Sequence, residues 1–232
     1  MLLEEDDPET TEGEKRARLA AARDYQERVE EALIVVKELQ DAGKAEARAS
    51  TTDAEARVMK MPDGGYRPGY NVQMATAGSP MGGARTVVGV RVTNVGSDMG
   101  SVTPMLDEIE DRTGQLPKTL MADAGHAKHD CIRECAERGV EALITVPVRS
   151  ATPGSQADQD PAIVAWRERM NTEEAKTTLR ARASLCELSN AHLKHHHGMA
   201  QVLVRGTAKV LCVALLCALS ANLVTHAAAW LA

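Results

Sequence analysis

Aromatic residues are nearly absent from this sequence. Phenylalanine does not occur, and Phe, Trp and Tyr together make up 2% of the 232 residues. Apolar residues nevertheless amount to 44% and charged residues to 26%, the balance of an ordinary globular protein. Wholesale disorder is therefore not expected, because disordered chains combine few apolar residues with high net charge. The length suits one medium-sized domain or two small ones.

The sequence also lacks the signs of export. Its start, MLLEEDDPET, is acidic, whereas a signal peptide begins with a basic region. The five cysteines are odd in number and lie mostly in apolar or helical surroundings, which does not indicate a disulfide framework. We therefore expect a reducing, cytoplasmic location.

A long uninterrupted apolar run is missing as well. The most apolar segment covers residues 210–232, but Ser220, Asn222, Thr225 and His226 interrupt it. A membrane-spanning helix needs about 20 consecutive, predominantly apolar residues. This segment is therefore expected to be a buried C-terminal helix, and no membrane partner is expected.

The net charge of −6 argues at first against a nucleic-acid partner. The excess acid lies entirely in residues 1–50, which hold 8 basic and 14 acidic residues, whereas residues 51–232 hold 19 of each. Residues 175–210 are basic and contain a single acid, Glu187. The later part of the chain is therefore compatible with binding a polyanion.

The first part of the chain has the pattern of an amphipathic helix. Within residues 12–48, Val29, Leu33, Val36 and Leu39 follow one another at three- and four-residue steps among charged residues. This pattern indicates a helical hairpin or a short coiled-coil arm, most simply a solvated spacer. We divide the chain into a helical arm, residues 1–49, and a second domain, residues 50–232.

The second domain alternates strands and helices before it becomes helical. Strands that alternate with helices after a hairpin favour a mixed α/β sheet over a barrel or a sandwich. In chain order we expect a hairpin of strands 70–76 and 86–93, a helix at 101–114, a strand at 116–123, a helix at 129–139, a strand at 140–148, a loop at 149–161 and a helical C-terminus.

Asp123 is the first candidate for chemistry. It closes an apolar strand, and Ala124 and Gly125 directly after it leave the backbone room to turn. Open α/β sheets bind their ligands at the carboxyl ends of their strands. The structural alternative is an aspartate that caps the helix at 129–139.

Glu187 is the second candidate. Asn190 and Lys194 follow it at +3 and +7, so that the three residues lie along one helical stripe. An acid, an amide and a base surrounded by positive charge suit a site for a divalent cation and a phosphate. The alternative is an exposed glutamate in a surface ion pair.

Several separated segments resemble one protein family in its own order. They are STTDAEARVMKMPDGGYRPGYNVQMAT, RVTNVGSDMGSVTPMLDEIEDRTGQLPKTLMADAGH and GMAQVLVRGTAKVLCVALLCALSANLV. Together they resemble the C-terminal portion of bacterial insertion-sequence DDE transposases, which have an RNase H-like catalytic domain. The resemblance extends from about residue 50 to the C-terminus.

The resemblance assigns roles to individual residues. Asp123 matches the family's second catalytic aspartate, with His126 in place of the usual tyrosine. Glu187 matches the catalytic glutamate, and Lys194 matches the lysine that follows it after six residues. Arg182 is the best match for the signature arginine, at a slightly different spacing. These matches imply Asp123 and Glu187 as catalytic metal ligands.

The sequence departs from the family at two points. Leu179 or Arg180 occupies the position of the signature tyrosine. The family's first aspartate, in a D-G-T/S motif on the central strand, has no match before the helical arm, and Asp53 reads as part of a helix cap beginning at Thr52. The resemblance therefore implies an RNase H-like mixed sheet that is incomplete because its central first strand is missing.

The family's chemistry implies both cofactors and partners. Three carboxylates hold two Mg²⁺ or Mn²⁺ ions about 3.5 to 4 Å apart and support phosphodiester cleavage and strand transfer. The implied partner is double-stranded DNA, both as transposon ends and as target, so the protein would be associated with the nucleoid. The residues implied as DNA contacts are Lys194, Arg182, Asn190 and Arg205. Homo-oligomerisation is left open.

Without the first aspartate we expect a truncated, inactive copy. The alternative is a non-catalytic protein that binds DNA or regulates transposition. Two other interpretations are less well supported by the sequence. One is a zinc site formed by Cys131 and Cys135 with the histidines at 195–197, although the spacing of these residues is not that of a regular zinc site. The other is a general helical interaction protein.

Overall fold

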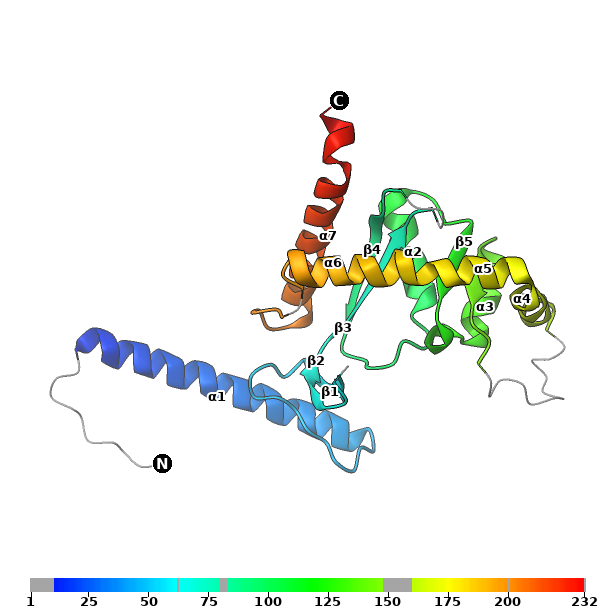
Figure 1. The fold of residues 1–232 in the computed structure, drawn as a ribbon. Helices are drawn as coiled ribbons and strands as arrows, with labels where there is room; N and C mark the ends of the chain where they lie inside the picture. Colours follow the sequence, from blue (N-terminus) through cyan, green and yellow to red (C-terminus); the bar gives the residue numbers. More distant parts are fainter. Residues whose placement is uncertain (1–10, 62, 80–82, 148–159, 200, 232) are drawn as a thin grey trace. The chain divides into compact units, whose positions relative to one another are not determined.

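The computed structural model describes residues 11–61, 63–79, 83–147, 160–199 and 201–231 (Figure 1). The chain forms two compact units, one of Met1–Tyr70 with Arg205–Thr207 and one of Asn71–Val204 with Ala208–Ala232. Short strands and helices make up both, so the mixed α/β class is confirmed. The RNase H-like arrangement and the domain boundary between residues 49 and 50 stay predictions.

The first unit begins with a long helix, α1 (Glu12–Asp41). Its N-terminus is a capping box, in which the Thr11 hydroxyl accepts from the Glu14 amide and the Glu14 carboxylate accepts from the Thr11 amide. The described residues from 12 to 48 form this one helix followed by turns, rather than a helical hairpin. Ala32 is its buried residue, whereas Leu33 and other apolar side chains are exposed.

A small antiparallel hairpin, β1 (Arg57–Lys60) and β2 (Tyr66–Gly69), completes the regular structure of this unit. The helix cap expected at Asp53 is wrong, because a turn and then β1 follow it. Asp53 instead accepts hydrogen bonds from the Tyr70 hydroxyl at 2.8 Å and the Gly206 amide at 3.0 Å. Burial, reinforced by Asp53, raises the pKa of Tyr70, so the phenol remains a donor.

The described strands of the second unit form two separate two-stranded sheets. In the first pair, β3 (Asn71–Ala77) and β4 (Thr86–Thr93) are antiparallel, which confirms the predicted hairpin. In the other pair, β5 (Thr119–Ala122) and β6 (Glu141–Ile144) are parallel. Within the described part of the chain, no strand joins β3 to β5.

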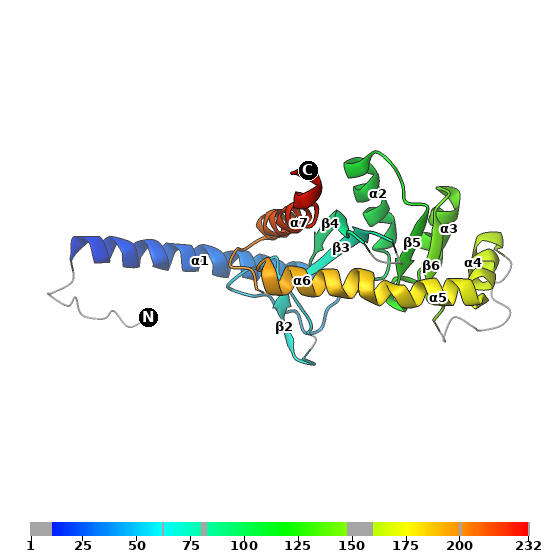
Figure 2. The same cartoon turned by 45° about the horizontal axis from the view of Figure 1, so that its top comes forward.

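Two helices cover the two faces of the β3–β4 hairpin (Figures 1 and 2). The predicted helix α2 (Val102–Thr113) packs on the face of Gly89, where an added Cβ would lie 2.7 Å from the Met105 sulfur. It ends at Gly114, which adopts a left-handed conformation. The C-terminal helix α7 (Thr207–Trp230) packs on the other face, against Val72 and Met74.

The main core surrounds the β5–β6 pair. Trp166 is 1% exposed and donates its indole N–H to the Ile144 carbonyl at 3.0 Å. Helix α2 contributes Val102 and Leu106 to this core, and three further helices border it: α3 (His129–Glu137), α4 (Pro161–Asn171) and α5 (Glu173–Arg182). The predicted helix and strand after Asp123 are therefore confirmed, whereas the predicted loop at 149–161 lies, up to residue 159, outside the described residues.

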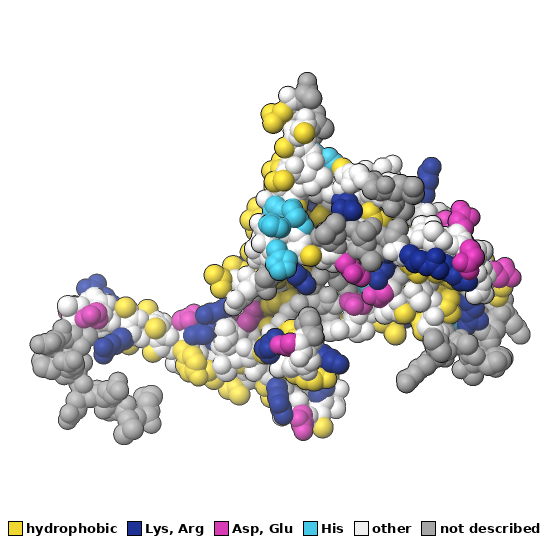
Figure 3. All heavy atoms as spheres, viewed as in Figure 1, with side chains coloured by type: hydrophobic (Ala, Val, Ile, Leu, Met, Phe, Trp, Pro, Cys, Tyr) yellow, Lys and Arg dark blue, Asp and Glu magenta, His cyan; other side chains and the backbone are white. Residues whose placement is uncertain are grey.

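The C-terminal part is helical, as predicted. After α5 come a π-helical segment, η4 (Ala183–Glu187), and α6 (Leu188–His196). The prediction of a buried last helix is only half right, because α7 buries Val210, Ala214 and Ala218 but exposes Leu216, Leu219 and further apolar side chains (Figure 3). By length and composition alone, α7 could cross a bilayer, which is weak evidence for a span.

Candidate functional site

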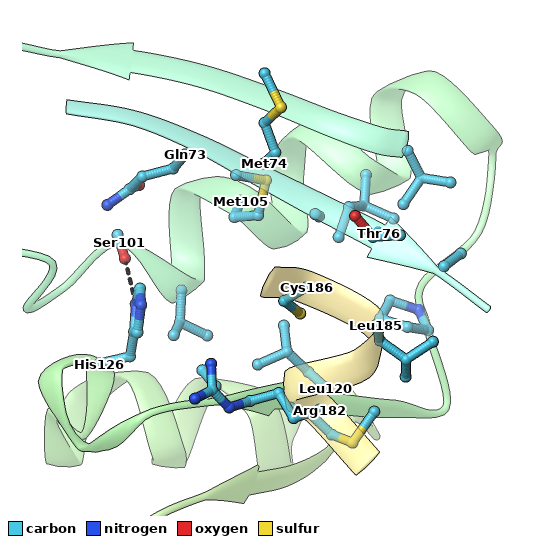
Figure 4. A pocket seen from close by; sticks show the side chains of 18 of the residues that line it. Gln73, Met74, Thr76, Ser101, Met105, Leu120, His126, Arg182, Leu185 and Cys186 are labelled. Carbon is cyan, nitrogen blue, oxygen red and sulfur yellow. Dashed lines mark hydrogen bonds between the residues drawn. The ribbon is translucent and has the colours of Figure 1, made fainter. Parts of the chain in front are cut away.

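A pocket of about 570 Å³ lies between the two strand pairs of the second unit (Figure 4). Residues 71–78, which include all of β3, line one side, and residues 119–123, from β5 to Asp123, line the opposite side. Helix α2 contributes Met105, and the π-helical segment η4 contributes Leu185 and Cys186. Candidate residues from three parts of the chain therefore meet in one space.

Asp123 lies at the carboxyl end of β5, as the sequence predicts. Its Oδ1 accepts a hydrogen bond from the Gly125 amide at 2.9 Å and so caps the short 3₁₀ helix η1 (Ala124–His126). The alternative that it caps the helix at 129–139 is wrong, because Lys128 occupies that position. The Asp123 side chain is 51% exposed and lines the pocket, which leaves it accessible to a ligand.

His126 connects Asp123 with the start of α2. Its Nδ1 lies 2.8 Å from the Ser101 hydroxyl (Figure 4). Its Nε2 lies 3.8 Å from Asp123 Oδ1. The imidazole therefore has a polar contact on each side. When protonated, it would place positive charge beside the Asp123 carboxylate.

Asp98 is a pocket residue that the sequence did not single out. Its Oδ1 accepts hydrogen bonds from Asn71 Nδ2 at 2.7 Å and Gln73 Nε2 at 3.0 Å. Burial by itself would raise the pKa of Asp98, but these two bonds, together with nearby His126, outweigh it and lower the pKa. The sequence does contain a signal for a polar site here. Asn71 and Gln73 are two positions apart on a predicted strand, so their amide side chains lie on the same face of it.

Glu187 lies at the end of η4 and does not line the pocket, whereas Arg182 and Asn190 do. Its side chain is 68% exposed, and its Oε1 lies 3.8 Å from Arg182 Nη2. The predicted stripe assumed regular α-helical spacing, which the π-helical segment interrupts before Asn190. The structure thus brings Asp123, Arg182 and Asn190 to one pocket and leaves Glu187 in an exposed ion pair.

The other predicted DNA contacts lie elsewhere. Lys194 is exposed on α6. Arg205 belongs to the first unit, where its Nη1 lies 3.9 Å from Asp24 Oδ2 on α1. The pocket therefore does not unite all four residues assigned to DNA, and the roles of these two stay predictions.

The carboxylates of the pocket do not complete a two-metal centre. No group of three metal-ligating side chains occurs among the residues that the structure describes. Asp98 and Asp123 are two hard oxygen donors in the same pocket, but such a centre requires a further bridging ligand. The two carboxylates of this pocket are therefore too few to support two-metal catalysis by themselves.

The zinc interpretation is not supported by the surroundings of the cysteines. Cys131 and Cys135 are buried in the main core. Burial, with a smaller effect of Cys131 and Glu134, raises the pKa of Cys135 to about 11. A zinc ligand must be a thiolate, so these cysteines act as core side chains.

The fold and the site together define a class of protein. It is an α/β domain with an acid, and with basic or amide side chains, at the carboxyl end of a strand. Comparison with protein families makes the class specific. The model of the transposase DDE domain matches residues 41–223, and the chain belongs to this family. Searches of curated proteins and of solved structures found no match.

Proposed function

We propose that the chain is part of the DNA-acting domain of an insertion-sequence transposase. Family membership supports DNA as the substrate and phosphoryl transfer as the chemistry. The observation that carries the proposal is the joint presence of Asp123, Arg182 and Asn190 in one pocket at the end of β5. These groups are suited to a hard cation, a phosphate and a neutral polar atom, respectively.

Each residue has a distinct part in this proposal. The Asp123 carboxylate is a ligand for Mg²⁺ or Mn²⁺, and Arg182 contacts a DNA phosphate. Exposed Lys194 adds a second phosphate contact farther along the same run of helices. Glu187 remains a proposed ligand, although in this structure its carboxylate pairs with Arg182.

We further propose that this chain by itself binds DNA without cutting it. The pocket holds two carboxylates, Asp98 and Asp123, and Glu187 lies outside its lining. Two-metal phosphoryl transfer needs a more complete ligand set. A regulatory, DNA-binding role in the cytoplasm, at the nucleoid, fits this combination better than independent transposition.

A nicking assay tests the absence of cleavage. Purified chain and Asp123→Ala are incubated with supercoiled plasmid and Mg²⁺ or Mn²⁺, and open-circular product is measured. We expect equal, background nicking from both proteins. Nicking by the natural chain that Asp123→Ala abolishes would show that the chain is a complete enzyme and would overturn this part of the proposal.

A salt titration tests DNA binding. The affinity for a duplex oligonucleotide is expected to fall as salt rises, with a slope of about 0.9 for each phosphate contact. Arg182→Ala should reduce that slope by about one contact. Arg112→Ala, which removes an exposed arginine paired with Glu108 on α2, is the matched control and should change it little. Absence of salt-dependent binding would contradict a DNA-acting domain.

A further inference from the structure

A second pocket of the second unit lies apart from the site described above. Its volume is about 300 Å³, room for several water molecules of about 30 Å³ each. Arg85 lines it from the segment just before β4, His192 lines it from α6, and Thr225 lines it from α7. The two pockets share no described lining residue, so this second space is not part of the site at Asp123.

The elements that build this second pocket carry no acidic residue. Residues 83–87, α6 and α7 contain no aspartate or glutamate. Glu187, directly before α6, is 68% exposed and lies next to Arg182. Besides Arg85 and the histidines at 192, 196 and 197, the titratable groups of these elements are Lys194, His195, Lys209, Cys212, Cys217 and His226. The charged surroundings of the pocket therefore favour an anion.

Two buried nitrogen atoms without a hydrogen-bond partner lie around His192. Among the described residues these are Arg85 Nε, in the same pocket as His192, and His197 Nε2, whose ring centroid is 5.0 Å from that of His192. A buried N–H without an acceptor has lost its hydration, which costs free energy. An oxygen atom of a ligand at Arg85 would remove that cost.

Three imidazole rings meet at this end of α6. The ring centroid of His192 lies 4.8 Å from that of His196 and 5.0 Å from that of His197. Histidine side chains gather here on the surface beside α7 (Figure 3). His197 is fixed between the helices, because its Nδ1 lies 2.9 Å from the Ser220 hydroxyl and its carbonyl accepts from the Cys217 thiol. Burial, together with the neighbouring His192 and His196, lowers the pKa of His197. An anion beside these rings would oppose that effect and favour their protonation.

We infer that this second pocket binds a phosphate group or another tetrahedral oxyanion, with Arg85 and His192 as its charged donors. A guanidinium presents its N–H donors in a planar fork that matches two oxygens of one phosphate. His192 adds positive charge when it is protonated, and the Thr225 hydroxyl offers a further donor. The apolar side chains of Val87 and Leu193 also line the pocket, and their low polarity strengthens each charged hydrogen bond.

This anion site goes beyond the proposed function, because it depends neither on Asp123 nor on a metal ion. Two sources supply the same ligand chemistry: a phosphate of the DNA backbone, or a free anion such as inorganic phosphate. Both present the oxygens that Arg85 lacks as acceptors. The test therefore has one arm with a free anion and one arm with DNA.

The first arm follows sulfate binding to the full chain by NMR. Sodium sulfate replaces sodium chloride at constant ionic strength, and the Nε–H resonance of Arg85 and the ring protons of His192 are recorded. We expect saturable shifts of both, because both groups line the pocket. Absence of a saturable shift at Arg85 would overturn the inference.

Matched variants separate a built site from general attraction of anions. Arg85→Gln should weaken sulfate binding at His192 at least about 10-fold, because a charge-assisted hydrogen bond is lost. Arg91→Gln changes an arginine of β4 that lines neither pocket, and it should leave the affinity unchanged. An unchanged indole N–H resonance of Trp166 shows that both variants are folded. Equal sulfate affinity of Arg85→Gln and the natural chain would overturn the inference.

The histidines should make sulfate affinity depend on pH. Sulfate keeps its charge between about pH 5.5 and pH 8, so a change in affinity over this range comes from the protein. If the anion raises the pKa of the cluster by about one unit, binding tightens up to about 10-fold as the pH falls through about 6.5. His192→Gln should flatten this dependence, whereas His195→Gln, an exposed histidine of the same helix, should retain it. An affinity that does not rise as the pH falls would overturn the role of His192.

The second arm repeats the salt titration with a duplex oligonucleotide. If the bound group is a DNA phosphate, Arg85→Gln should lower the salt slope by about one contact as well as weaken sulfate binding. If it is a free anion, Arg85→Gln should weaken sulfate binding alone. Loss of DNA affinity with undiminished sulfate binding would overturn the inference. Sulfate binding at Arg85 by a chain without salt-dependent DNA affinity would retain this site and contradict the DNA-acting domain instead.

Discussion

The two strand pairs of the second unit differ in the number of buried side chains that pack around them. The β5–β6 pair lies in a cluster of thirteen buried residues, which includes Trp166, Ile144 and Ile163, all almost fully buried. The β3–β4 pair has Val90, Ala214 and Ala218 as the buried centre of its largest cluster, supported by partly exposed side chains. Because burial of apolar surface dominates stability, β5–β6 should open less often than β3–β4.

This difference matters for the site because the pocket lies between the two pairs. Asp123 is attached to the densely packed pair, whereas Asn71 and Gln73, the partners of Asp98, belong to the sparsely packed one. One wall of the pocket is therefore held firmly and the other is held weakly.

Trp166→Ala should abolish the difference between the pairs. The truncation removes a side chain that is 1% exposed and its hydrogen bond to Ile144, and such changes cost about 3 to 5 kcal/mol. Hydrogen exchange should then show β6 amides no longer slower than those of β4, and urea denaturation should give the lower stability. A loss below about 1 kcal/mol would mean that Trp166 does not anchor this core.

Asn222→Ala should widen the difference. The Asn222 side chain accepts from the Val87 amide and donates to the Val87 carbonyl, both at 2.8 Å, and so ties α7 to β4. Losing both bonds should destabilise the hairpin by about 1 to 3 kcal/mol and speed exchange at β4 but not at β6. Asn171→Ala, at the exposed end of α4, is the matched control and should change neither. Faster exchange at both pairs would show that they open together.

The sequence predicted the elements of the second unit well because their signals are local. Gly114 and Gly139 mark the ends of α2 and α3, and alternating apolar residues mark β3 and β4. The hairpin β1–β2 is not among the predicted elements, because the Gly and Pro residues around it hide two short strands. The exposed face of α7 could not be foreseen from an apolar segment whose packing depends on distant residues.

The site was only partly predictable for a related reason. Asp123 follows a strand, so its place at the sheet edge comes from local pattern. The position of Glu187 depends on a π-helical segment that no residue spacing reveals, and Asp98 enters the pocket through contacts with residues more than twenty positions away. Such long-range contacts require the folded chain.

Asp98→Ala should weaken the link between Asp98 and the start of β3. The variant leaves the amides of Asn71 and Gln73 without their charged acceptor, and for this partly exposed group we expect a loss of about 1 kcal/mol at pH 7. Because the folded state lowers the pKa of Asp98, its contribution is present above the unfolded pKa and is lost as the pH falls through the lower, folded value.

The measurement is urea denaturation of the natural chain and Asp98→Ala from pH 7 to pH 3. The gap in unfolding free energy should be constant down to about pH 5 and should shrink below about pH 4. Asp111→Ala, an exposed aspartate of α2, is the control. A gap that grew as the pH fell would contradict the assigned direction of the pKa shift.

Glu187→Ala should have the smallest effect and leave both strand pairs as they are. Its carboxylate is 68% exposed and pairs with Arg182 at 3.8 Å, and exposed ion pairs contribute less than about 1 kcal/mol. We expect a change in unfolding free energy below about 0.5 kcal/mol and unchanged exchange at β4 and β6. Glu174→Ala, at the exposed start of α5, is the matched control. A loss above about 1 kcal/mol for Glu187 alone would show that its carboxylate has a structural role that an exposed ion pair does not provide.

Because the expected cost in stability is small, Glu187→Ala can also be used in DNA-binding assays. A change in its DNA affinity would not be confused with unfolding, as it would be for a substitution in the β5–β6 core.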